Sequence, residues 1–600
     1  MGFPARIALH SLIAALAAGA AIGMSQAQQG APMSGHDMAD MQAVPPPEQL
    51  PVPLRMTGIG NSHITIKTSP EAQAWFDQGL SLQHDFWDYE AQKAFEQSIR
   101  VDPQCAMCWW GLAQAEGFRH STVQAYGKHA LEEAGRLMSH ASESDKFYIE
   151  AAQAEQVAKD DDHEQQTAIL RNLVKKYPHD IEARIFLGFS VRDGYDDQGE
   201  PKAGQKEYLS ILESVLQEAP NDSAANHYWI HAIEMGSHPE RALKSAAVLA
   251  SLAPTSGHMV HMPGHIYYRV GNYAEAEHWF AASTEADERY MREQNVDRDN
   301  DWNYIHNLMY GIANLMEQGK LEQANALSDH AAAGRGKLSD TLYIWSSRDQ
   351  MARISNRLPI ALRFGDWEAV LTMTGQVKLE GEKTANLRSL AAELTDYAKG
   401  MKALEQDDAV GAQAASNRMD AALWRLQQRA ADEKTAKDKE KDDKKDAPPM
   451  EPVMPDALSD PILKSLSVAS LELRAGILVA QAKLDEAKKL YASAQLEEKN
   501  LGYHEPPMYI RPVGETEAAA LMRAKDYAGA TAAYEAALME RPNSGFGLYG
   551  LARVKEAQGD TAGAREAYAA FLKAWANADA ALPEVAHAKQ VVSGESLAVR

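Results

Sequence analysis

Several features common in enzymes and membrane proteins are missing from this 600-residue sequence. It has no GxxxxGK[ST] phosphate loop, no GxGxxG after a strand and no GxSxG elbow, so the usual signatures of nucleotide binding and of serine hydrolases are absent. Glycine, proline and strand-type runs are too sparse to indicate an extended sheet. The net charge of −24 disfavours nucleic acid and anionic membranes as partners. The hydrophobic content of 45% is ordinary for a globular protein with a large core.

Long apolar runs are also lacking, except at the N-terminus. Arg6 precedes an apolar stretch over residues 7–22, and residues 25–27 (Ser-Gln-Ala) resemble a small-x-small cleavage site. This pattern is typical of a secretory signal peptide over residues 1–27, because the run is shorter than the ~20 residues that span a bilayer. No cysteine follows the cleavage region to carry a lipid anchor. We therefore expect a periplasmic or secreted protein with no membrane span.

The rest of the chain contains a repeat of helical type. The segment 72–105 carries large and small residues at regular places, namely Trp75, Gly79, Ala91, Phe95 and Pro103. Segment 257–290 has Gly264, Ala276 and Phe280 in the corresponding places, and segments 511–544 and 545–578 continue the pattern. This resembles the tetratricopeptide repeat, a helix–turn–helix unit of about 34 residues. The resemblance implies an all-α, tetratricopeptide-repeat superhelical solenoid, in which small residues let paired helices approach and aromatic rings fill the space opposite.

Two segments fall outside this pattern and suggest the domain boundaries. Residues 28–68 contain Pro45-Pro46-Pro47, several methionines and few bulky apolar residues, which predicts a disordered leader. Between Asp432 and Asp446, 13 of 15 residues are charged, so this stretch cannot bury a core. We therefore expect an N-terminal array over residues 69–430, a charged and proline-containing linker over 431–460, and a C-terminal array with a cap over 461–600.

Six histidines fall at matching positions of three consecutive repeats. Segments 223–256 and 257–290 align without a gap, and each carries histidine at positions 5 and 9. The set comprises His227, His231, His258, His261, His265 and, in the third repeat, His306. Residues four apart on a helix share a face. The resemblance to tetratricopeptide repeats further implies that these positions line the concave surface, where ligands are bound.

Several interpretations of this histidine set remain open. Neutral imidazole is a good ligand for copper, zinc or iron, and neighbouring helices about 8–10 Å apart allow rings from both to reach one ion. Glu234 would then be a fourth ligand, an orienting partner or a base for a metal-bound water. Alternatively, the histidines line a groove for a peptide or small molecule, or form a packed polar network. Pro263 is expected to kink its helix and to re-aim the histidines before it relative to His265.

The chain has only two cysteines, Cys105 and Cys108. Covalent haem attachment would need histidine at position 109, where Trp109 stands. A redox-active or metal-binding pair at a helix N-terminus and a small structural disulfide in an oxidising compartment both remain open.

Three local motifs resemble those of exported bacterial tetratricopeptide-repeat proteins, a largely uncharacterised family. They are CAMCWWG at residues 105–111, HMPGHIY at 261–267 and HEPP at 504–507. The resemblance extends over about residues 70–580 and implies a fold rather than an activity. We therefore expect an exported binding or scaffold protein that takes a protein or peptide ligand on its concave surface and carries a histidine-rich site for a transition metal. The alternative is a metal-dependent enzyme, redox or hydrolytic, that uses the same histidines.

Overall fold

The structure is a computed structural model that describes most of the chain from residue 46 onward. The described residues are 46–117, 124–158, 163–196, 198–298, 301–334, 347–376, 385–443 and 460–594. The predicted signal peptide and the first part of the leader lie outside them. Within the described residues the fold is all-α, with no strand beyond an isolated bridge between Tyr195 and Pro201. No helix in this part of the chain has both the length and the apolar character needed to cross a membrane.

The chain divides into two compact units. Unit 1 comprises Met1–Tyr267, His278–Asn307 and Gly336–Leu342, and unit 2 comprises Tyr268–Glu277, Leu308–Arg335 and Tyr343–Arg600. The division lies near residues 268–307. Helices on both sides of the charged segment share one core, in which Leu423 and Leu426 belong to the same cluster as Ile462. The domain boundaries expected from composition stay a prediction.

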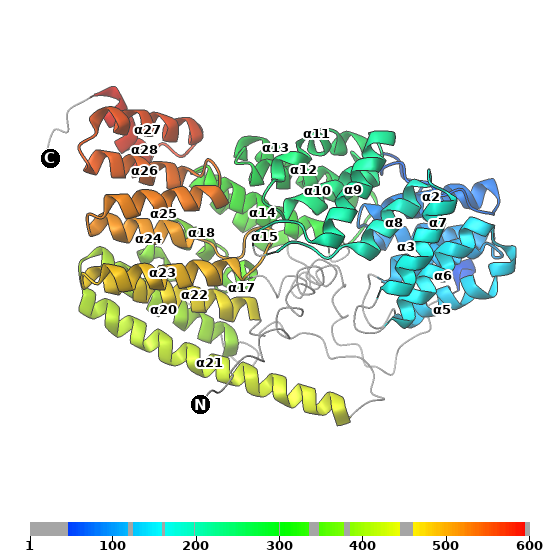
Figure 1. Ribbon diagram of the computed structural model, residues 1–600, viewed down its shortest axis with the longest axis horizontal. Helices are drawn as coiled ribbons and strands as arrows, with labels where there is room; N and C mark the ends of the chain where they lie inside the picture. The colour runs from blue at the N-terminus through cyan, green and yellow to red at the C-terminus, as the bar shows by residue number, and fades with distance from the viewer. Residues whose placement is uncertain are drawn as a thin grey trace, which may run out of the picture. The chain divides into compact units, whose positions relative to one another are not determined.

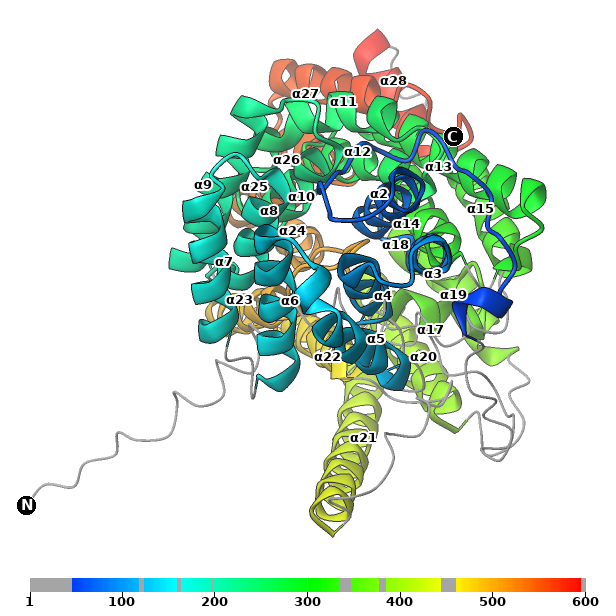
Figure 2. The ribbon, with the colours of Figure 1, turned by 90° about the vertical axis from the view of Figure 1, so that its right-hand side faces the viewer.

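Unit 1 is built from successive helix pairs joined by short turns, which Figure 2 shows in blue to green. Its helices are α2 (Pro70–His84), α3 (Asp88–Val101), α4 (Ala106–Gly117), α5 (Gln124–Arg136), α6 (Glu143–Val157), α7 (Glu164–Lys176), α8 (Ile181–Val191), α9 (Ala203–Glu218), α10 (Ser223–Glu234) and α11 (Leu243–Leu252). Three further helices cross the division between the units: α12 (Gly257–Arg269), α13 (Tyr273–Glu293) and α14 (Trp302–Glu317). Short 3₁₀ turns lie at Pro47–Gln49, Met138–His140 and Pro239–Ala242.

Unit 2 continues the same construction, and Figure 1 shows α22 to α27 stacked in chain order. Its helices are α15 (Leu321–Gly334), α17 (Ser347–Ile354), α18 (Leu358–Phe364), α19 (Trp367–Gly375), α20 (Ala385–Glu405), α21 (Ala409–Asp443), α22 (Asp460–Ala480), α23 (Leu484–Lys499), α24 (Val513–Arg523), α25 (Tyr527–Glu540), α26 (Gly545–Ala557), α27 (Thr561–Ala574) and α28 (Pro583–Ser593). The charged residues up to Asp443 extend α21 as a helix, and 444–459 lie outside the described residues.

The small and large residues of the repeat pack against each other as the sequence predicted. A Cβ atom on Gly79 would lie 2.8 Å from the Phe95 ring, and one on Gly264 would lie 2.5 Å from the Phe280 ring. Only glycine permits this approach, because a real Cβ at such a distance would clash. The expected all-α helical-repeat fold is therefore confirmed by the packing of its helix pairs.

Part of the predicted leader packs on unit 1. Ile59, Ile64 and Ile66 are buried, which the low overall hydrophobicity of residues 28–68 did not indicate. Asn61 accepts a hydrogen bond from the backbone N–H of Ser223 through its Oδ1 (2.9 Å), and its own N–H donates to Ser223 Oγ (3.0 Å). Ser223 is the first residue of α10, so residues 59–66 secure the start of a helix that carries the candidate site.

Candidate metal centre

The six predicted histidines come together inside unit 1, where three helices supply them. Helix α10 carries His227, His231 and Glu234, helix α12 carries His258, His261 and His265, and helix α14 carries His306. Asp222 caps the start of α10 by accepting a hydrogen bond from the N–H of Ala225 (2.7 Å). Apart from His306, which is partly buried, these side chains are buried, and those of His227, His261, His265 and Glu234 are fully inaccessible.

The imidazoles form two groups of three, which we call trio A and trio B. Trio A is His227, His231 and His258, and trio B is His261, His265 and His306. Within each trio, one ring nitrogen from every member lies within 4.8 Å of the others. Pro263 lies inside α12, and the two histidines before it are assigned to different trios. The spacing of the histidines predicted one common face, but the structure has two adjoining clusters.

In trio A, the Nδ1 atoms of all three rings face hydrogen-bond acceptors. His227 Nδ1 lies 2.6 Å from the backbone carbonyl of His84, His258 Nδ1 lies 3.3 Å from Asn303 Oδ1, and His231 Nδ1 lies 2.6 Å from Glu234 Oε1. The amide of Asn303 is oriented by its own Nδ2, which donates to Asp287 Oδ2 (2.8 Å) and Ser283 Oγ (3.2 Å). Its Oδ1 is therefore the acceptor, and the Nδ1 of His258 carries the proton.

Trio B is oriented in the same manner. His261 Nδ1 lies 2.7 Å from Asn307 Oδ1, and the Nδ2 of Asn307 donates to the carbonyl of Phe280 (2.9 Å) and to Thr284 Oγ1 (2.8 Å). His265 Nδ1 lies 2.6 Å from Glu234 Oε2. In a neutral imidazole only one nitrogen carries a proton. The proton of these two rings is held at Nδ1, which leaves the lone pair on Nε2.

The Nε2 lone pairs converge within each trio. His227 Nε2 lies 3.0 Å from His258 Nε2, and His261 Nε2 lies 2.5 Å from His265 Nε2. His231 Nε2 is buried and has no hydrogen-bond partner among the described residues. Two lone pairs that face each other in an apolar interior repel, unless a cation or a proton lies between them. Donation from Nδ1 to a carbonyl, amide or carboxylate oxygen, with Nε2 directed inward, is the arrangement that orients metal-binding histidines.

Burial favours the neutral form of four of these imidazoles, His227, His258, His261 and His306, and the neutral form is the one that binds metal. Burial lowers the pKa of His227, His258 and His261 well below the ordinary histidine value, and neighbouring histidines lower it further. Burial also lowers the pKa of His306 to about 3. Burial by itself would raise the pKa of Glu234, but His265 and His231 outweigh it and hold that pKa well below the usual range. Glu234 is therefore a carboxylate that accepts two imidazole N–H groups.

Two aromatic residues form a wall against the histidines. The Phe86 ring centroid lies 4.7 Å from that of His227 and 5.2 Å from that of His258. Phe86 has a positive φ of 58°, a conformation that is costly for a bulky residue and that recurs at functional sites. Trp302 packs 5.0 Å from His258 and donates its Nε1–H to the Phe86 carbonyl (2.9 Å). Such a wall limits access of water to the imidazoles.

Sequence reasoning missed the residues that orient the histidines. Asn303 and Asn307 are spaced i, i+4 on the helix of His306, which is a signal that could have found them. His84 contributes a backbone carbonyl, which leaves no trace in sequence. Its imidazole belongs to neither trio and lies between Glu182 Oε2 (2.8 Å) and the Tyr228 hydroxyl (2.9 Å).

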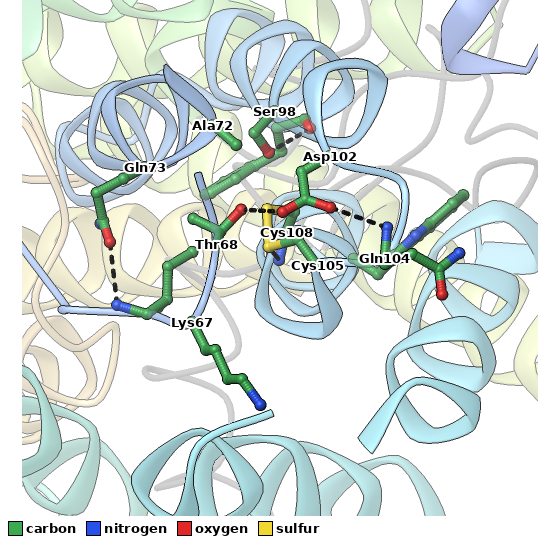
Figure 3. The surroundings of a disulfide bond; sticks show 12 residues. Lys67, Thr68, Ala72, Gln73, Ser98, Asp102, Gln104, Cys105 and Cys108 are labelled. Atoms are coloured by element: carbon green, nitrogen blue, oxygen red, sulfur yellow. Dashed lines mark hydrogen bonds between the residues drawn. A yellow bond between two sulfur atoms is a disulfide. The ribbon is translucent and has the colours of Figure 1, made fainter. Parts of the chain in front are cut away.

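The two cysteines form a disulfide at the start of α4 (Figure 3). Cys105 and Cys108 are both buried, and the N–H of Cys108 donates to Cys105 Sγ. Asp102, in the preceding turn, accepts hydrogen bonds from Thr68 Oγ1 (2.7 Å) and from the N–H of Gln104 (3.2 Å). Both sulfur atoms are used in this bond, and the choice between a structural and a redox-active disulfide stays a prediction.

Comparison with known proteins adds no functional assignment. The chain matches no protein-family model and no curated protein. Similar solved structures include the APC/C hetero-tetramer Cut9–Hcn1, at 12% identity, with 88% of this chain and 78% of that chain covered and a TM-score of 0.28. Yeast Tom70 is 13% identical over 87% of this chain and 95% of its own, with a TM-score of 0.29. The human IFIT1 dimer with m7Gppp-AAAA is 13% identical over 84% and 97%, with a TM-score of 0.32. At these scores, the fold assignment rests on the helices of this chain.

Proposed function

We propose that this chain is an exported helical-repeat binding protein that holds a transition metal ion, copper, zinc or iron, among its buried histidines. The proposal depends on one observation: the imidazoles direct their Nδ1 protons to other acceptors, and their Nε2 lone pairs converge. Imidazole nitrogen is a ligand that these ions accept well, and a cation removes the repulsion between the facing lone pairs. Partner binding by the helical repeats and export after cleavage at Ala27 belong to the same proposal.

The burial of the site favours a metal ion over a peptide as its ligand. His227, His261 and His265 have no accessible surface, so a peptide backbone has no route to them without rearrangement of the helices. A protein or peptide ligand would instead bind to the exposed surfaces of the repeats. The ligand-binding groove and the metal site, which the repeat pattern predicts to coincide, would then be separate.

A metal-dependent enzyme is the second candidate, and one observation favours it. Each trio offers three imidazoles, and three protein ligands with an open fourth position are typical of catalytic zinc sites. Glu234 would not be the base in such a reaction, because both of its oxygens accept hydrogen bonds from imidazole N–H groups. Its role is to orient His231 and His265.

Total metal content tests the proposal. Protein without a histidine tag would be purified from the periplasmic fraction beside a His227→Ala/His261→Ala double variant. His238→Ala serves as the matched control, since that side chain is 63% exposed and lies outside both trios. We expect near-stoichiometric metal in the parent and the control and none in the double variant, with helix content unchanged in all three. The proposal is wrong if the parent protein contains no metal and cannot be loaded by reconstitution with copper, zinc or iron. N-terminal sequencing that does not begin at Gln28 would contradict the cleavage site.

A further inference from the structure

The six histidines offer more than one position for an ion. A lone-pair contact lies inside each trio, between His227 and His258 at 3.0 Å and between His261 and His265 at 2.5 Å. An ion placed in trio A relieves the first contact and leaves the second unrelieved. An ion placed in trio B relieves the second contact and leaves the first. One ion therefore relieves only one of the two lone-pair contacts.

The distances between the trios also argue against one central ion. Ring centroids lie 4.5–6.0 Å apart within the trios, and 6.0 and 6.3 Å apart for His258–His261 and His231–His265 across them. The ring nitrogens separate more clearly, because those within 4.8 Å of one another belong to the same trio, with His258 in trio A and His261 in trio B. Zinc–imidazole bonds are about 2.0–2.1 Å, which requires ligand nitrogens to converge tightly, as they do within a trio.

A single carboxylate connects the two trios. Glu234 Oε1 lies 2.6 Å from His231 Nδ1 in trio A, and Oε2 lies 2.6 Å from His265 Nδ1 in trio B. Its side chain is fully buried, so its charge is directed to these two rings. One residue therefore sets the tautomer of one histidine in each trio, as expected of a centre that is built as a unit.

We propose that the site is a two-metal centre. One transition metal ion is bound by the Nε2 atoms of trio A, a second by Nε2 of His261 and His265 with a ring nitrogen of His306, and Glu234 is shared behind both. This inference rests on the proposed function and specifies its stoichiometry. Each ion has three imidazole ligands and keeps a coordination position for an external ligand. The two open positions make the centre suited to a ligand that bridges two ions.

Native mass spectrometry of the full mature chain titrated with Zn²⁺ tests the stoichiometry, with Cu²⁺ titrated in parallel. The parent should saturate at two ions per chain, and so should His238→Ala. His231→Ala, in trio A, and His306→Ala, in trio B, should each saturate at one. Circular dichroism shows whether each variant keeps its helix content, and the parent stoichiometry tests the inference without any substitution.

The outcomes separate this inference from the proposed function. The two-metal centre is wrong if the parent saturates at one ion and either variant abolishes binding of that ion. The proposed function, with a single metal ion, would then still hold. A parent that binds no ion overturns both. Two ions in the parent, with one retained in each folded variant, support the assignment of one ion to each trio.

Discussion

Replacing Glu234 by glutamine tests how the buried carboxylate organises the site. Both carboxylate oxygens accept hydrogen bonds, one from His231 Nδ1–H and one from His265 Nδ1–H, each at 2.6 Å. Glutamine has nearly the same shape but offers one oxygen and one NH₂ group. One imidazole keeps its acceptor. The other faces a donor and must move its proton to Nε2, which removes the lone pair that would bind metal.

The expected magnitude follows from this exchange. Loss of an orienting partner behind a metal-ligating histidine costs about 10–100-fold in metal affinity, or about 1.4–2.8 kcal/mol. Because only one of the two imidazoles loses its acceptor, Glu234→Gln should weaken one ion by that factor and leave the other near its parental affinity. Removing the carboxylate or its side chain altogether would disturb both rings and would not give this asymmetry.

Competition with a chromophoric chelator measures the two affinities separately. Glu240→Gln is the matched control, because Glu240 makes a similar contact with His238 Nδ1 (3.1 Å) at the exposed surface. The control should bind metal as the parent does. If Glu234→Gln binds every ion with parental affinity while remaining folded, the tautomer argument is refuted. An equal loss for both ions would show that the carboxylate acts through its charge and not through the direction of its hydrogen bonds.

Two further predictions concern packing and titration. Gly264→Ala would place a Cβ 2.5 Å from the Phe280 ring and should lower the free energy of unfolding by about 1–3 kcal/mol in urea titrations. Gly375→Ala, where nothing lies within 4 Å of the added Cβ, is the control, and equal effects would refute the close-approach argument. Burial raises the pKa of Glu472 to about 7, so the stability that this carboxyl contributes is present below about pH 4.5 and is lost as the pH rises through 7. Glu472→Gln should remove up to about 3 kcal/mol of that dependence, and an unchanged slope of unfolding free energy against pH would contradict the assignment.

The fold was predictable because it depends on local sequence patterns. Glycine and phenylalanine at fixed places, such as Gly79 with Phe95, specify how closely two helices of a pair approach, and the contact lies within 16 residues of chain. The leader was predicted less well, since Ile59, Ile64 and Ile66 are too few to alter the composition of residues 28–68. Their burial depends on where the other helices lie.

The histidine site was only partly predictable from sequence. Helical geometry places His227 with His231, and His261 with His265, on common faces, so the four were recognisable as pairs from their spacing alone. Their division into two trios depends on how α10, α12 and α14 pack, which no spacing within one helix encodes. The tautomers depend on the carbonyl of His84, 143 residues from His227, and on amides that a third helix supplies. Sequence by itself therefore determined which side chains were available, and only tertiary structure decided which lone pairs meet, because hydrogen-bond partners distant in the chain choose the nitrogen that carries the proton.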